Sequence, residues 1–187
     1  MPRERRIEEP GGWYHVVSRG NNKQPIFDSA LRALFLIQLA RVALRFGWQV
    51  IAYALMTNHF HLVFRLAEGG LSDGMCELNT GFARASNARF GRINHCLGRR
   101  FWSAHIETEP HLLATIRYVM WNPVRAGAAR HPADSNWTSF RAGAGLELAP
   151  NCLALPELLG LFDPNPKAAH GAFARFVSEL GGAYALT

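Results

Sequence analysis

The order of the apolar segments along the chain constrains its fold more than any other feature. β-branched and aromatic residues between turn signals indicate strands, and apolar side chains at helical spacing indicate helices. The segments found in this way are a strand at Trp13–Ser18, a helix from Asp28 or Ser29 to Phe46, strands at Trp48–Met56 and His59–Leu66, a helix from Ser72 or Asp73 to Phe90, and a β-hairpin at Arg92–Thr108. This is the split β-α-β order of a ferredoxin-like, or RRM-like, α+β sandwich. We expect an antiparallel sheet with helices packed mainly on one face, which leaves the other face available to a ligand.

The rest of the chain is less regular. Glu109-Pro110 is a good start for a helix over His111–Trp121, and Asn122-Pro123 is expected to end it. Two shorter helices are predicted at Leu155–Leu161 and Ala168–Leu180. We therefore expect a main domain over residues 1–141 and a short, mostly helical C-terminal extension over residues 142–187, for which regulation is a candidate role.

Positive charge is concentrated in the main domain. The 187 residues include 20 Lys and Arg against 14 Asp and Glu, and residues 1–141 hold 18 of these cations and 10 of the acidic residues. A basic body with a mildly acidic tail suggests a polyanion as partner. Only Lys23 and Lys167 are lysines; guanidinium groups suit nucleic acid, although a G+C-rich genome would also favour arginine.

The cysteines and the apolar runs indicate a soluble protein of a reducing compartment. Cys76, Cys96 and Cys152 are odd in number and far apart, which argues against disulfides and against a zinc site. The N-terminal stretch lacks the apolar segment of a signal peptide, and no run approaches the roughly 18 apolar residues that span a bilayer. We expect no membrane association and a cytoplasmic location.

The sharpest local motif is His59-Phe60-His61 within a predicted strand. Side chains alternate along a strand, so the two imidazoles project from one face about 7 Å apart and can both reach one divalent ion. The motif is common, however, and two ordinary half-buried histidines would give the same pattern.

A second candidate pair lies on the helix that ends near residue 122. Tyr118 and Asn122 are four residues apart and therefore lie one turn apart on one helical face. The phenol can attack phosphorus, and the carboxamide oxygen can ligate a metal or orient the ring. A core tyrosine and a helix-terminal asparagine would look the same.

In combination these features resemble the HUH single-strand endonucleases and, more narrowly, the REP-associated tyrosine transposases, which are related to the small insertion-sequence transposases. The matching stretches are Tyr14–Asp28, Ala54–Phe64, Arg99–Ser103, Arg117–Gly127 and Trp137–Phe140. The resemblance implies that Tyr118 is the nucleophile and that His59, His61 and Asn122 hold a divalent metal, Mg²⁺ or Mn²⁺. It also implies cleavage and rejoining of single-stranded DNA at or near hairpins through a 5′-phosphotyrosine.

Several cations and amides are candidates for contact with DNA. The loop after the first strand offers Arg19, Asn21, Asn22 and Lys23, although a polar turn would look alike. Arg99 and Arg100 precede Phe101-Trp102, a pattern fit for backbone contact and base stacking in which only one of the two aromatic residues can face DNA. Arg117 and Arg125 flank Tyr118 and could hold a phosphate or pair with a carboxylate.

Alternatives to an active transposase stay open at this point. One is a non-catalytic, domesticated binder of DNA hairpins, and another is a phosphodiesterase that uses water, with Tyr118 structural. We favour a monomer over a homodimer. Our hypothesis for the acidic extension is that it folds over the DNA face and restrains activity.

Overall fold

The computed structural model describes residues 8–93, 95–98 and 100–179. Its strands are β1 (Trp13–Arg19), β2 (Gln49–Leu55), β3 (His59–Arg65) and β4 (Trp102–Ile106). Its α-helices are α1 (Ser29–Phe46), α2 (Leu71–Phe90), α3 (Glu109–Arg125), α4 (Phe140–Gly143), α5 (Leu155–Gly160) and α6 (Pro166–Ser178), with short 3₁₀ turns η1 (Asn21–Lys23) and η2 (Pro132–Asp134). No helix in these ranges is long and apolar enough to cross a membrane.

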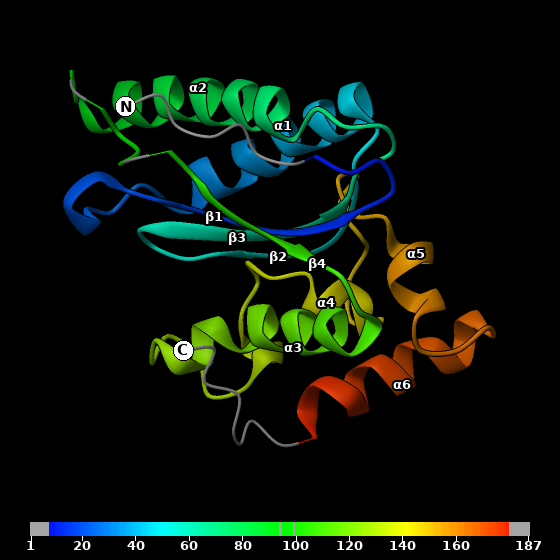
Figure 1. Cartoon of the computed structure of the whole chain (residues 1–187). Helices are drawn as coiled ribbons and strands as arrows, with labels where there is room; N and C mark the ends of the chain where they lie inside the picture. Colours follow the sequence, from blue (N-terminus) through cyan, green and yellow to red (C-terminus); the bar gives the residue numbers. More distant parts are fainter. Residues whose placement is uncertain (1–7, 94, 99, 180–187) are drawn as a thin grey trace.

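The four strands form one antiparallel sheet in the order β2-β3-β1-β4 (Figure 1). β1 lies in the interior of the sheet, with Val17 opposite His61 of β3 on one side and opposite Trp102 of β4 on the other. The succession of strands and helices up to β4 is the predicted one, and the α+β sandwich is confirmed. The interior position of β1 brings its residues next to the histidines of β3.

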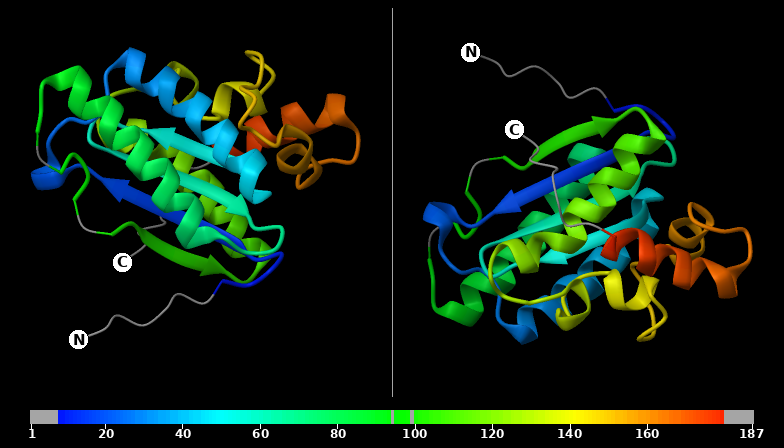
Figure 2. Two further views of the ribbon diagram at one scale, coloured as in Figure 1. Left: turned by 90° about the horizontal axis from the view of Figure 1, so that it is seen from above. Right: turned by 90° about the horizontal axis from the view of Figure 1, so that it is seen from below.

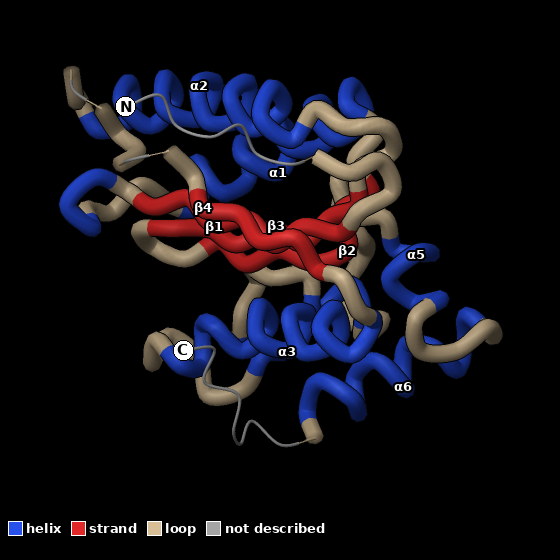
Figure 3. The backbone as a smooth tube through the Cα atoms, viewed as in Figure 1, coloured by secondary structure: helices blue, strands red, loops and turns tan. Residues whose placement is uncertain are grey.

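Helices cover both faces of the sheet, which differs from the expected one-sided arrangement. α1 and α2 lie side by side on one face, and α3 lies across the other with the C-terminal helices around it (Figures 2 and 3). The reason is visible in β3, where apolar side chains point both ways. Phe60, Leu62 and Phe64 join a core with α1 and α2, whereas Val63 joins a second core with Ile116 of α3. Neither face of the sheet is therefore free of helices.

Helix α3 extends one turn further than predicted. It reaches Arg125, and Pro123 lies inside it rather than after it. A proline this close to the end removes one backbone hydrogen bond, and the last turn still closes because the N–H of Ala126 donates to the carbonyl of Asn122 (3.0 Å). The predicted end of the helix at Trp121 is therefore wrong, and Asn122 is a helical residue.

The predicted β-hairpin at Arg92–Thr108 is wrong for the part that the structure describes. Only β4 is a strand there, and it pairs with β1. The segment before it lies against the turn that follows β1, where Gly20 and Leu97 form an isolated antiparallel bridge. Alternation of side chains shows that a segment is extended, but it does not show which neighbour the segment pairs with.

The C-terminal extension is helical and shares a core with the sheet. Leu158 of α5 and Phe173 and Val177 of α6 are buried in the same apolar cluster as Val63 and Ile116. The predicted boundary between residues 141 and 142 falls inside α4. The described part of the extension is therefore packed as a layer of the fold rather than as a separate body.

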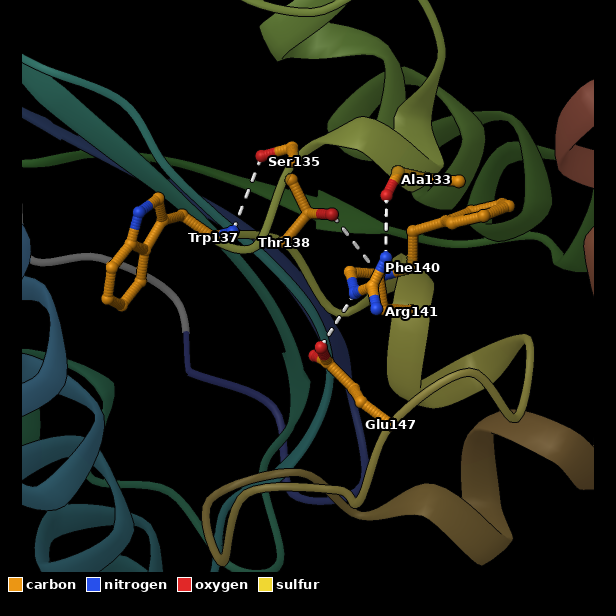
Figure 4. Close-up of polar contacts among 7 residues, drawn as sticks. All are labelled: Ala133, Ser135, Trp137, Thr138, Phe140, Arg141 and Glu147. Atoms are coloured by element: carbon orange, nitrogen blue, oxygen red, sulfur yellow. Dashed lines mark hydrogen bonds and ion pairs between the residues drawn. The ribbon is translucent and has the colours of Figure 1, made fainter.

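The link between α3 and the extension covers the outer edge of β2. The N–H of Leu55 donates to the carbonyl of Trp137 (2.8 Å). Further on, the Arg141 side chain donates to the carbonyl of Ala133 (3.0 Å) and pairs with Glu147 (2.8 Å), as Figure 4 shows. An edge strand covered in this way cannot pair with another chain, and the link fixes the start of the extension to the sheet.

Candidate active site

β3 presents His59 and His61 on the sheet face that α3 covers. Their ring centroids are 5.1 Å apart. Phe60, between them, is fully buried in the core on the opposite face. The alternation of side chains along a strand predicts this separation of faces.

α3 places Tyr118 against this histidine pair. The ring centroid of Tyr118 lies 5.7 Å from that of His61, with the rings nearly perpendicular at 78°. The phenol ring is half-buried, and the guanidinium carbon of Arg125 lies 5.0 Å from its centroid. The fold thus brings together a phenol and two imidazoles from two different elements.

A third histidine, which the sequence analysis did not select, completes the cluster. His15 of β1 is 5% exposed, and its Nε2 lies 3.0 Å from Nδ1 of His61. Its ring centroid is 6.0 Å from that of Tyr118. Within WYHVVSR, His15 and Ser18 are polar residues at buried positions. That signal becomes informative only once the pairing of β1 with β3 is known.

Hydrogen bonds fix the orientation of both β3 imidazoles. Nδ1 of His59 lies 2.7 Å from Oδ1 of Asn58, which can only accept, so this nitrogen carries the proton and Nε2 keeps its lone pair. Asn58 in turn donates to the carbonyl of Lys23 (2.9 Å). Nε2 of His61 is buried and has no hydrogen-bond partner among the described residues. If His61 donates through Nδ1 to His15, this buried nitrogen also presents a lone pair, as a metal ligand requires.

The environment keeps the three imidazoles neutral at physiological pH. Burial lowers the pKa of His15 to about 4, with nearby His111 adding to the effect. Burial, and then the charge of Arg19, lowers the pKa of His59 to about 4. The pKa of His61 is held well below its usual range by burial first and by His15 and His59 next. Neutral imidazole is the form that ligates a metal or accepts a proton.

Asn122 lies on the same face of α3 as Tyr118 and is 9% exposed. Its Nδ2 donates to the backbone carbonyl of Tyr118 (2.9 Å). Among the described residues, no group of three or more His, Cys, Asp or Glu side chains is arranged to hold a metal ion. The residues nevertheless fit a catalytic metal, because two neutral imidazoles and one amide oxygen would leave positions open for the oxygens of a substrate.

The loop after β1 lies beside His59. The N–H of Gly20 donates to the carbonyl of Asn58 (2.7 Å), the residue that orients His59. Asn22 and Lys23 have positive φ angles of 51° and 57°, which turn the chain sharply. Arg19 and Lys23 are exposed there. The loop thus sets two cations, and the amides of Asn21 and Asn22, at one end of the histidine cluster.

The other predicted DNA contacts differ in their surroundings. Arg100 is exposed and donates to the hydroxyl of Ser72 (3.3 Å), and Arg99 lies outside the described residues. Arg117 points to the far side of α3, where its guanidinium donates two hydrogen bonds to the carbonyl of Phe176 (3.0 and 2.7 Å) and lies over that residue's ring. The structure therefore brings Arg125 to the Tyr118 ring but ties Arg117 to α6.

Comparison with known proteins identifies the family to which the chain belongs. The profile of IS200-like transposases matches residues 10–119, which include β1, the histidine pair and Tyr118. The chain belongs to the IS200-like transposase family. A search of curated protein sequences finds no match.

One solved structure shows the same fold. A REP-associated tyrosine transposase bound to a REP hairpin superposes with a TM-score of 0.69 at 19% identity, and the match covers 82% of this chain and 92% of that one. A candidate transposase from Deinococcus radiodurans (15% identity, 65% and 95% coverage) and a tRNA(His) guanylyltransferase from Saccharomyces cerevisiae (12% identity, 91% and 76% coverage) both reach a TM-score of 0.44. Only the first of these three likenesses is close enough to support the fold.

Proposed function

We propose that this family member is a single-strand DNA endonuclease and strand-transfer enzyme of the REP-associated type, with Tyr118 as nucleophile. The observation that carries the proposal is the packing of the Tyr118 ring against His61, whose Nε2 is buried without a partner in the part of the chain that the structure describes. An unpartnered polar atom in a protein interior is costly and calls for an explanation. A ligand at that nitrogen, next to a phenol, explains it in a family whose members are transposases.

The proposed reaction is a transesterification. The phenol oxygen of Tyr118 attacks phosphorus, the bond from phosphorus to the 3′-oxygen breaks, and a 5′-phosphotyrosine forms. The phenol proton passes to solvent, and the departing 3′-oxygen takes up a proton to become a hydroxyl group. Attack by a 3′-hydroxyl on the phosphotyrosine reverses the step and joins the strand at a new site. Arg125, beside the phenol ring, is placed to hold the phosphate in reach.

His59, His61 and Asn122 would hold the divalent ion, Mg²⁺ or Mn²⁺. Such an ion, when bound, polarises the phosphate and stabilises the charge on the departing oxygen. Nitrogen ligands favour Mn²⁺ over Mg²⁺ on affinity, and Zn²⁺ would suit the imidazoles too. Asn58 and His15 contribute by holding the two rings in the orientation that leaves Nε2 facing the substrate.

We further propose that the substrate is a DNA hairpin with unpaired flanks and that a monomer binds it. The structurally similar REP-associated tyrosine transposase is bound to a REP hairpin. The cations of Arg19, Lys23, Arg100 and Arg125 would contact the phosphates, and Asn21 and Asn22 would contact the phosphates or unpaired bases.

The test uses labelled DNA hairpins with single-stranded flanks on both sides. Wild type, Tyr118→Phe and Tyr53→Phe are compared with Mn²⁺ and with chelator, and the products are separated on a denaturing gel. Tyr53 is a matched control because its phenol is buried in the core on the opposite sheet face. We expect a covalent protein–DNA band that needs metal, that Tyr53→Phe retains and that Tyr118→Phe loses.

The other outcomes would each contradict a different part of the proposal. Cleavage that survives in Tyr118→Phe would make water the nucleophile. Tight hairpin binding without cleavage, over a broad set of hairpins and metals, would identify a domesticated binder. A metal-independent adduct would remove the role of His59, His61 and Asn122 as ligands.

A further inference from the structure

Trp102 is an exposed aromatic side chain next to the histidine cluster. It is the first residue of β4 and is 54% exposed, whereas the preceding Phe101 is 6% exposed in the core on the α1 and α2 side. The sequence allows only one of these two rings to face a ligand, and the fold selects Trp102. Its ring meets that of His15 nearly at right angles (82°), with centroids 5.3 Å apart.

The side chain of His15 links Trp102 to Tyr118, the proposed nucleophile. His15 touches Trp102 on one side and lies 6.0 Å, ring to ring, from Tyr118 on the other. β4 is an edge strand of the sheet, and Trp102 on it is half exposed among the described residues. A planar group lying on that indole would be near the Tyr118 ring, with His15 between them.

The indole borders a cavity of about 420 Å³ between β4 and the loop after β1. Among the residues that the structure describes, three cations line this cavity and no acidic side chain does. The lining residues are Val17, Arg19, Gly20, Asn21, Asn22, Lys23, Gly98, Arg100, Phe101 and Trp102. The volume lies within the range of about 300–1,000 Å³ that is usual for small-ligand sites. An aromatic ring, cations and amides together are the combination that binds an unpaired nucleotide.

We propose that Trp102 is a stacking platform for one unpaired base of the DNA strand next to the phosphate that Tyr118 attacks. The inference rests on the proposed function, because it assigns a subsite of the same site. The base lies on the indole, and its phosphates lie against Arg19, Lys23 and Arg100. Stacking tolerates any base, so the platform fixes the position of the strand more than its sequence.

The test measures stacking directly with 2-aminopurine, whose fluorescence falls when it stacks on an aromatic ring. The probes are a single-stranded oligothymidylate with one 2-aminopurine, and a DNA hairpin whose single-stranded flanks carry it at each position in turn. Wild type, Trp102→Ala and Trp102→Phe are compared, with Phe90→Leu as the control, since Phe90 is an exposed ring at the end of α2. Circular dichroism checks that each variant is folded.

We expect wild type to quench 2-aminopurine at one or two adjacent flank positions. Trp102→Ala should lose the quenching and bind about 5- to 100-fold more weakly, Trp102→Phe should retain most of both, and Phe90→Leu should behave as wild type. Equal quenching by Trp102→Ala and wild type would overturn the platform, even if the covalent adduct forms. Quenching that depends on Trp102 without any adduct would uphold the platform and contradict the transesterase.

Discussion

At the scale of single residues, the contact between His15 and His61 leads to a test of the proposed metal site. Replacing a partner that orients a metal ligand typically lowers metal affinity or activity about 10- to 100-fold. We expect His15→Phe to weaken Mn²⁺ binding by that factor, measured by calorimetry, and to lower the yield of adduct in parallel. His15→Gln, which keeps a polar group near Nδ1 of His61, should recover part of both.

His105 provides the matched control. It lies on β4 opposite Tyr14, with its ring 5.1 Å from that of Tyr14 and away from the three clustered histidines. His105→Gln should leave Mn²⁺ affinity unchanged. If His15→Phe binds Mn²⁺ as wild type does, His15 is a packing residue and His61 does not depend on it for orientation.

The residues of the site differ in how far the sequence could predict them. Alternation within one strand places His59 and His61 on one face, and one helical turn separates Tyr118 from Asn122, so local spacing predicts both pairs. His15 depends on the register between β1 and β3, which opposes Val17 and His61. Such a register joins residues far apart in the chain, and no local pattern encodes it.

At the scale of elements, α6 is expected to stabilise the whole fold. Phe173 is fully buried, in ring contact with Phe140 and Phe162, and a side-chain carbon on Gly143 would lie 2.5 Å from its ring. Truncating such a side chain costs about 3–5 kcal/mol. We expect Phe173→Ala to lower the free energy of unfolding by that amount in a single transition, measured by urea denaturation.

Lys167→Ala, at an exposed position of the same helix, should change the free energy of unfolding by less than about 0.5 kcal/mol. A sheet that unfolds at the wild-type midpoint in Phe173→Ala would show that the extension is an independent appendage. The packing also bears on the hypothesis that the extension restrains activity. α6 lies on the far side of α3 from the sheet (Figure 1), so its removal is expected to expose the core rather than to uncover the histidines.

The elements themselves were largely predictable, and the exceptions have a common cause. The helices and strands up to β3 follow from apolar spacing and from local signals such as Asp28, whose side chain accepts the N–H of Leu31 (2.8 Å). The segment before β4 and the last turn of α3 depend on neighbours instead. Leu97 pairs with Gly20, and Asn122 and Pro123 are buried, neither of which the local sequence specifies.

At the scale of the whole molecule, the distribution of charge predicts how DNA binding responds to salt. The chain carries a formal charge of +6, and Arg19 and Lys23 are exposed beside the histidine cluster. For single strands, the slope of log affinity against log salt concentration changes by about 0.7 for each phosphate contact. We expect the double variant Arg19→Gln, Lys23→Gln to bind oligothymidylate with a slope about 1.4 shallower than wild type.

A variant at Arg117 tests whether the salt dependence of DNA binding comes from local phosphate contacts or from the net charge of the protein. Arg117→Gln removes a cation from the same helix as Tyr118, but its guanidinium is bound to the carbonyl of Phe176 behind α3. If phosphates are contacted only on the sheet side, this variant lowers the net charge and leaves the salt slope unchanged. Fluorescence anisotropy over a KCl series measures all three slopes. A shallower slope for Arg117→Gln would mean that DNA also wraps around the outer side of α3, and an unchanged slope for the double variant would remove the loop after β1 from the DNA interface.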